Sequence, residues 1–258
     1  MDAEKLSKLK QVSQTLATII DLAGKAVVER VRPLDIDIYI KELCDKYEVK
    51  SVIFGHEGFP NYSCISINKV CCHGIVTDKS PLFRLKDNVK IDLAIEKDGI
   101  ISDSCRTYFI EGTAFDTKMY AFNKKLVKSC ITHLNKLLTT RDYVTPVDIA
   151  SYIKQRVKES VIYDCVECYG GHGVGNRLHE PPWIPYNPKL VIEKDFKLTQ
   201  DSVFTIEPII TRKHKSLPRV DKDGWSVYLQ GNSTQYEETV LINNGRIECL
   251  TSLNNKNK

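Results

Sequence analysis

An Asp98-Gly99 pair constrains the fold of this chain more than any other feature of its sequence. Such a pair between two alternating runs is typical of a two-residue β-hairpin turn. If these residues form the loop, Asp92 on the first strand lies opposite Cys105 on the second. Asp103 then shares a face with Asp92, because side chains alternate along a strand. The two carboxylates are therefore expected diagonally across the hairpin, within about 8 Å.

The apolar residues of the first strand, Val89, Ile91, Leu93 and Ile95, have the opposite parity and predict a buried face. Two carboxylates held this close repel each other, and a cation between them would remove that penalty. The pair therefore suggests a metal site. Two solvated strand acids are the alternative, and the pair taken alone favours that alternative.

The composition is that of an ordinary soluble globular protein. The chain has 258 residues, of which 42% are apolar and 27% charged, so it can bury a sizeable core. The net charge of +4 is mild and spread along the chain, which does not indicate nucleic acid as the main ligand. No apolar run approaches the ~20 residues that span a bilayer. The last five residues, Asn-Asn-Lys-Asn-Lys, are expected to fray.

The nine cysteines are an odd number, and two of them, Cys71 and Cys72, are adjacent. The first residues lack the pattern of a secretion signal. Together these features predict a cytoplasmic protein with free thiols. Cys165 and Cys168 have the spacing of a zinc or redox pair, but no second pair follows at zinc-site spacing, so a structural role is expected.

Apolar periodicity predicts that two helices are followed by strands, and that this order of elements occurs twice along the chain. The expected elements are helices over 4–30, from about 35, over 117–138 and over 146–161, with strands over 51–112 and 163–253. We expect residues 1–258 to form a single domain of two pseudo-equivalent α+β halves, about 1–112 and 113–258. A site is expected where the halves meet.

Three further candidate ligands lie in the second half. His172 is surrounded by glycines, which would let the backbone pass close to a ligand. Glu207 follows a strand whose Phe204 and Ile206 share the opposite face. Glu237 and Glu238 must point to opposite faces, and parity alone does not decide which of them enters a site.

One imidazole and four carboxylates suit two hard or borderline divalent ions, such as Mn, Fe, Co or Zn. Paired ions about 3.5–4 Å apart are a known device for activating water. Taken singly, each of these residues is explained as well by a turn histidine or a solvated strand acid. The set is informative only as a whole.

The sequence resembles the type I methionine aminopeptidases, which have an α+β pita-bread fold with two pseudo-symmetric halves around a curved antiparallel sheet. The matching segments run in family order across nearly the whole chain: 66–74 (SINKVCCHG), 89–93 (VKIDL), 102–103 (SD), 170–175 (GGHGVG), 178–181 (LHEP), 205–208 (TIEP), 223–225 (DGW) and 235–239 (QYEET). The interval between His179 and Glu207 lacks the long helical insertion of the type II enzymes.

The resemblance implies that five side chains hold two divalent ions: Asp92, Asp103, His172, Glu207 and Glu237. It selects Glu237 over Glu238. By the same resemblance, Asp103 and Glu237 bridge the two ions. Asp92 completes one site, and His172 and Glu207 complete the other.

The resemblance also assigns catalytic roles to two further histidines. His73 would contact the amino end of the substrate, and His179 its scissile amide. Glu207 would also shuttle a proton to the leaving amine. A satisfied structural histidine is the alternative for His73 and His179.

Matching positions place Phe59, Cys64, Leu178 and Trp225 in a small apolar pocket for the methionine side chain, with His56 nearby. The alternative is that these are core residues. Leu178 stands where the family usually has an aromatic residue and His56 where it usually has tyrosine, which leaves the shape of the pocket open.

The implied function is removal of the N-terminal methionine from newly made proteins and peptides when the second residue is small. The reaction would be attack by a water or hydroxide between the two metals. The chain is expected to be a monomer that associates with the ribosome. One alternative is a pita-bread binding module without metals. The other is an X-Pro-specific aminopeptidase, but only 72 residues precede His73, too few for the extra domain that those enzymes carry.

Overall fold

The computed structural model describes residues 1–253, so the C-terminal segment expected to fray lies outside it. The N-terminal half contains α1 (Ala3–Lys25), α2 (Pro33–Lys46), β1 (Lys50–Ser51), the 3₁₀ helix η1 (His56–Gly58), β2 (Cys64–Ile67), β3 (Val70–Cys72), β4 (Asn88–Lys97) and β5 (Ile100–Phe109). The C-terminal half contains α3 (Ala114–Leu137), α4 (Pro146–Glu159), β6 (Tyr163–Cys165), β7 (Gly170–Gly173), β8 (Glu180–Pro185), β9 (Val203–Ile206), β10 (Ile209–Arg212), β11 (Arg219–Val220), β12 (Val227–Tyr228), β13 (Ser233–Gln235), β14 (Glu238–Asn243) and β15 (Arg246–Cys249).

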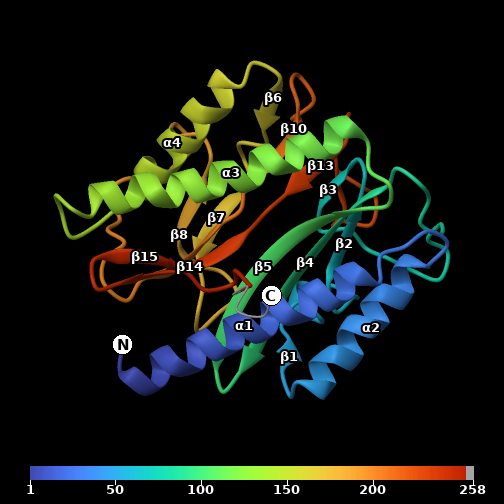
Figure 1. The fold of residues 1–258 in the computed structure, drawn as a ribbon, viewed down its shortest axis with the longest axis horizontal. Coiled ribbons are helices and arrows are strands. Elements are labelled where there is room, and N and C mark those ends of the chain that lie inside the picture. The colour runs from blue at the N-terminus through green and yellow to red at the C-terminus, as the bar shows by residue number, and fades with distance from the viewer. Residues whose placement is uncertain (254–258) are drawn as a thin grey trace.

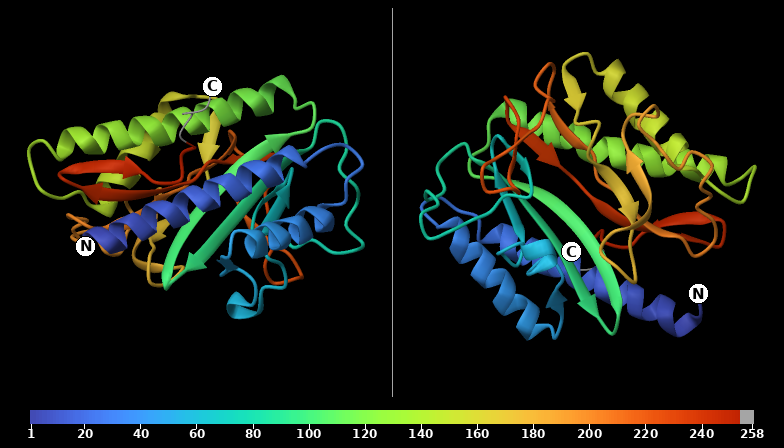
Figure 2. Two further views of the ribbon diagram at one scale, coloured as in Figure 1. Left: turned by 60° about the horizontal axis from the view of Figure 1, so that its bottom comes forward. Right: turned by 180° about the vertical axis from the view of Figure 1, so that it is seen from behind.

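Helices α1 and α3 lie across one face of the strands, one helix over each half (Figure 1). Figure 2 shows the same arrangement from behind, with the strands in front of both helices. Every strand pairing in the described part of the chain is antiparallel. No helix among the described residues is long and apolar enough to span a bilayer.

Local signals set most helix ends, but the first helix is shorter than predicted. It ends at Lys25 instead of residue 30 because the chain turns there. Arg30 has a positive φ and donates its backbone N–H to Phe83 O at 2.9 Å, so it belongs to a turn and not to a helix. The next helix begins at Pro33, a residue type suited to the first helical turn. The last helix begins with a capping box formed by Thr145 and Asp148.

The hairpin forms in the predicted register. Asp98 and Gly99 both have positive φ, as the favoured two-residue hairpin turn requires. Asp92 pairs with Cys105 and Ala94 with Asp103, which confirms that the two aspartates share a face. The other face of β4 is fully buried and belongs to the core cluster that includes α1 and α2 residues. The hairpin therefore carries its two acids on the side away from that core.

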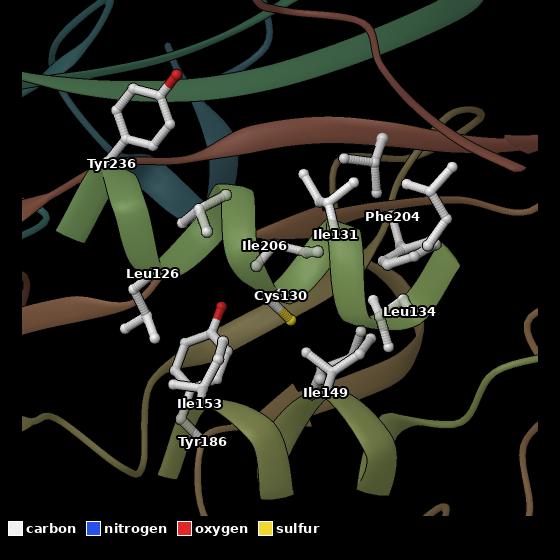
Figure 3. Packing of buried hydrophobic residues seen from close by; sticks show 14 of the residues in the cluster. Leu126, Cys130, Ile131, Leu134, Ile149, Ile153, Tyr186, Phe204, Ile206 and Tyr236 are labelled. Carbon is white, nitrogen blue, oxygen red and sulfur yellow. The ribbon is translucent and has the colours of Figure 1, made fainter. Parts of the chain in front are cut away.

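The C-terminal half has its own core under α3 and α4. Figure 3 shows side chains of the two helices, such as Leu134 and Ile149, pointing toward one another. Phe204 and Ile206 of β9 join them from the sheet and are fully buried. This face of β9 is the one predicted to be apolar, which leaves the opposite parity for Glu207.

Hydroxyl side chains join the halves where β5 meets β13 and β14. Ser104 Oγ donates to Glu237 O at 2.8 Å, and Thr239 Oγ1 donates to Asp103 O at 2.6 Å. The backbone N–H of Glu237 donates to Cys105 O at 3.0 Å. These contacts set Asp103 of one half beside Glu237 of the other.

Candidate metal centre

All five predicted ligands line one cavity of about 250 Å³ at the junction of the halves. The cavity is lined by Asp92, Asp103, His172, Glu207 and Glu237, together with His73, His179, Trp183, Gln235 and several neighbours. The carboxylates come from β4, β5 and the ends of β9 and β13, and the imidazole comes from β7. The site expected between the halves is therefore present as a cluster of acids and histidines.

The donor atoms are close enough to share cations. One ligand atom each from Asp103, His172 and Glu237 lie within 4.8 Å of one another. His172 Nε2 is 3.4 Å from Glu207 Oε1 and 3.7 Å from Asp103 Oδ2. Asp103 Oδ1 is buried and has no hydrogen-bond partner within the described part of the chain. A divalent cation would satisfy this orphaned oxygen.

The tautomer of His172 supports the same interpretation. Its Nδ1 lies 3.0 Å from Gly173 O, and a carbonyl can only accept, so Nδ1 carries the proton. Nε2 then presents a lone pair to the carboxylate oxygens of Asp103 and Glu207. Acceptors that face each other without a proton repel, and this arrangement is typical of a metal-binding histidine whose other nitrogen is held by the backbone.

Burial makes the cluster costly without a cation. It raises the pKa of Asp92, Glu207 and Glu237 well above the ordinary range, and the charge of Asp103 adds to the effect. Burial raises the pKa of Asp103 itself to about 7. Burial, assisted by His179, lowers the pKa of His172 to about 3, so this imidazole is neutral and free to bind a metal.

Chelating metal from the protein is expected to destabilise it, and more strongly at higher pH. The raised carboxyl pKa values mean that the metal-free native state binds more protons than the unfolded chain, so its free energy of unfolding falls as pH rises. The window runs from about pH 4, the unfolded value, to about pH 7 for Asp103. Urea denaturation at pH 5 and pH 8, with a chelator and with Co²⁺, measures the effect. Equal stability of the metal-free protein at both pH values would contradict it.

Close packing explains the glycines around His172. A Cβ on Gly170 would lie 2.1 Å from Ile184 O, and one on Gly171 would lie 2.1 Å from Thr205 O. The close approach that the structure shows is to the neighbouring strands β8 and β9. It holds β7, and His172 with it, tightly between them.

The residues that hydrogen-bond to Glu207 were not identified from the sequence. Thr205 Oγ1 donates to Glu207 Oε1 at 2.8 Å, and Gln235 Nε2 donates to Oε2 at 3.2 Å. The Glu207 backbone N–H donates to the hydroxyl oxygen of Tyr186 at 2.6 Å. Gln235 has the parity of Glu237 in the same short motif, and that signal could have identified it.

The structure shows which of the two adjacent glutamates faces the cavity, a choice that strand parity did not decide. Glu237 lines the cavity. Glu238 points elsewhere and is buried, where it accepts hydrogen bonds from Tyr236, Thr251 and Ser252. It also forms an ion pair with Arg106 at 3.1 Å.

The predicted apolar pocket residues gather beside the cavity and do not line it. Phe59 and Cys64 belong to one hydrophobic cluster, against which Leu178 and Trp225 pack. The rings of Phe59 and Trp225 meet edge to face with centroids 5.2 Å apart. The His73 ring lies 6.5 Å from that of Trp225, which connects this cluster to the acids.

Residues 8–244 match Metallopeptidase family M24. The chain belongs to this family. A relative named methionine aminopeptidase from Buchnera aphidicola subsp. Acyrthosiphon pisum is 30% identical over 255 residues, covering 96% of this chain and 91% of the relative. Another of that name, from Escherichia coli K12, is 27% identical over 256 residues, with the same coverage. Membership of a metallopeptidase family implies the use of divalent metal.

Solved structures support the fold. A methionine aminopeptidase from Thermotoga maritima superposes with a TM-score of 0.87 at 24% identity, covering 98% of each chain. An X-Pro aminopeptidase from Thermotoga maritima MSB8 gives 0.74 at 18% identity, and the match covers 98% of this chain but 62% of that one. The predicted family and the α+β pita-bread fold are confirmed.

Proposed function

We propose that the chain is a metal-dependent methionyl aminopeptidase, a hydrolase that removes the N-terminal methionine from proteins and peptides whose second residue is small. The observation that carries this proposal is the convergence of four carboxylates and His172 on one cavity. The M24 family membership and the named relatives favour this reaction over a binding module. The X-Pro alternative has less support, because the relatives at 27% and 30% identity are named methionine aminopeptidases, whereas the X-Pro enzyme is 18% identical.

The proposed centre holds two divalent ions, Co, Mn, Fe or Zn. Asp103 and Glu237 would bridge them, Asp92 would complete one site, and His172 and Glu207 would complete the other. When bound, such a pair lowers the pKa of water and polarises a carbonyl. The close donor atoms of Asp103, His172 and Glu237 support this assignment.

Two histidines at the cavity would handle the substrate. The His179 ring lies 4.5 Å from that of His172, and burial, together with His56, lowers its pKa. A neutral His179 can donate its N–H to the oxygen of the scissile amide. Burial lowers the pKa of His73 to about 4, so its neutral ring can accept a hydrogen bond from the substrate amino group.

Glu207 would carry a proton to the leaving amine. Its carboxylate faces the cavity and is held by Thr205 and Gln235, so its position does not depend on substrate. The methionine side chain would enter the cluster of Phe59 and Trp225 beside His73. A polarizable thioether packs well on such aromatic edges.

A cleavage assay with Met-Ala-Ser and Met-Gly-Ser, run with Co, Mn, Fe or Zn, tests the proposed function. Both peptides should be cleaved and Met-Lys-Ser should not, because a long second side chain would collide with the walls of the cavity. Glu207→Ala is the inactive control. Cleavage of an Ala-Pro peptide in place of Met-Ala-Ser would identify the X-Pro alternative. Metal content near zero under reducing, metal-supplemented conditions would favour the binding module.

We also propose that the enzyme acts in the cytoplasm as a monomer on nascent chains, in association with the ribosome. The nine cysteines are free thiols in the structure, and seven of them are buried, which is compatible with a reducing compartment. Co-sedimentation with translating ribosomes and size-exclusion chromatography test these points.

A further inference from the structure

One lysine of the central hairpin is completely buried. Lys90 is 1% exposed, and its Nζ lies 3.2 Å from each of three oxygens: Asn68 O, Asn88 Oδ1 and Ser233 O. No carboxylate among residues 1–253 forms an ion pair with it. A lysine is almost never buried unless it is paired, so neutral acceptors alone are an unusual environment.

The three oxygens belong to segments that lead to the proposed metal centre. Lys90 precedes Asp92 by two residues on β4 and shares its face. Ser233 opens β13, which continues to Gln235 and then to Glu237. Asn68 lies in the turn before β3, the strand that leads to His73. One ammonium group therefore ties together three segments from both halves of the chain.

Packing does not explain a charged group here. A methionine would fill a similar volume without the cost of removing an ammonium from water. Without the ammonium, two backbone carbonyls and a side-chain amide oxygen would face one another with their lone pairs. Oxygens arranged in this way attract a cation, and Lys90 supplies it from within the chain.

We propose that Lys90 is a positioning residue whose ammonium acts as a built-in monovalent cation and holds the strand with Asp92 against the segment with Glu237. This inference rests on the proposed metal centre. The charge of Lys90 and its positioning role are expected to change metal affinity in opposite directions. A positive charge near bound metal ions repels them, so loss of the charge alone would tighten metal binding. Loss of positioning would weaken it.

Calorimetric titration of metal-depleted Lys90→Met with Co²⁺ tests the proposal. The dissociation constant for Co²⁺ should rise by about tenfold or more, as for other groups that orient metal ligands. Lys97→Met is the matched control, because Lys97 lies on the same strand but is partly exposed and pairs with Glu48 at 3.5 Å. It should leave Co²⁺ binding unchanged. Unchanged or tighter binding in Lys90→Met would overturn the proposal.

Chemical rescue provides the second readout. In Lys90→Ala the missing part of the side chain corresponds to n-propylammonium, which should restore Co²⁺ binding, whereas tetramethylammonium, which lacks N–H donors, should not. Rescue by both cations, or by neither, would contradict the proposed role. If the Lys90 variants do not fold, Asn88→Ala keeps the ammonium and removes one acceptor, and it must weaken Co²⁺ binding in the same direction. These titrations contain no peptide, so a failure of methionine cleavage would leave their outcome intact.

Discussion

Asp103→Asn is expected to lower turnover of Met-Ala-Ser by at least about 100-fold, more than loss of an outer-shell partner costs. Asp103 lies among the other donors, with Oδ2 3.7 Å from His172 Nε2, and its buried Oδ1 has no hydrogen-bond partner in the described part of the chain. Asparagine has nearly the same shape but replaces one oxygen by an N–H donor group and removes the negative charge. It can no longer bridge two cations, so the metal content of the purified protein should fall with the activity.

Asp98→Asn is the matched control for this variant. Asp98 belongs to the same hairpin but occupies the exposed turn, where asparagine is equally suited to a positive φ. Activity and metal content should therefore stay at the wild-type level. Retention of more than about a tenth of the activity in Asp103→Asn would refute its bridging role, since residual catalysis of that size needs an intact centre.

The hairpin could be predicted from the sequence because its determinants are local. The turn at Asp98-Gly99 fixes the register, and the two-residue period of a strand then fixes the face of Asp92 and Asp103. The identities of the remaining ligands came from the resemblance to a family. Their convergence could not be derived from spacing, because it depends on how β5 meets β13 and β14.

Contacts between distant segments explain what the sequence left open. Parity separates Glu237 from Glu238 but does not say which side of the strand faces the cavity; contacts such as that between Ser104 and Glu237 decide it. Nothing in the sequence marks Lys90 as buried, but the structure buries it and brings Ser233 of the other half to its ammonium group. The early end of α1 has the same origin, since Arg30 is held by the distant Phe83.

Substitution of the adjacent residues Glu237 and Glu238 by glutamine is expected to separate an effect on metal binding from an effect on stability. Glu237→Gln should lose metal and lower turnover by at least about 100-fold, because it removes from the cavity a charge that is proposed to bridge the two ions. Glu238→Gln should keep both metal and turnover. It should instead lower the free energy of unfolding by about 3 kcal/mol, because the buried guanidinium of Arg106 loses its anionic partner.

Metal analysis and urea denaturation of the two variants separate these effects. Both substitutions remove one negative charge from neighbouring residues of one chain segment, so long-range electrostatics changes almost equally in the two proteins. Any difference between them must come from the direction in which each side chain points. If Glu238→Gln lost metal while Glu237→Gln kept it, the centre would lie on the opposite side of β14. Asp103 and His172, which share the cavity with Glu237, would then lack the second acid that is proposed to bridge the ions.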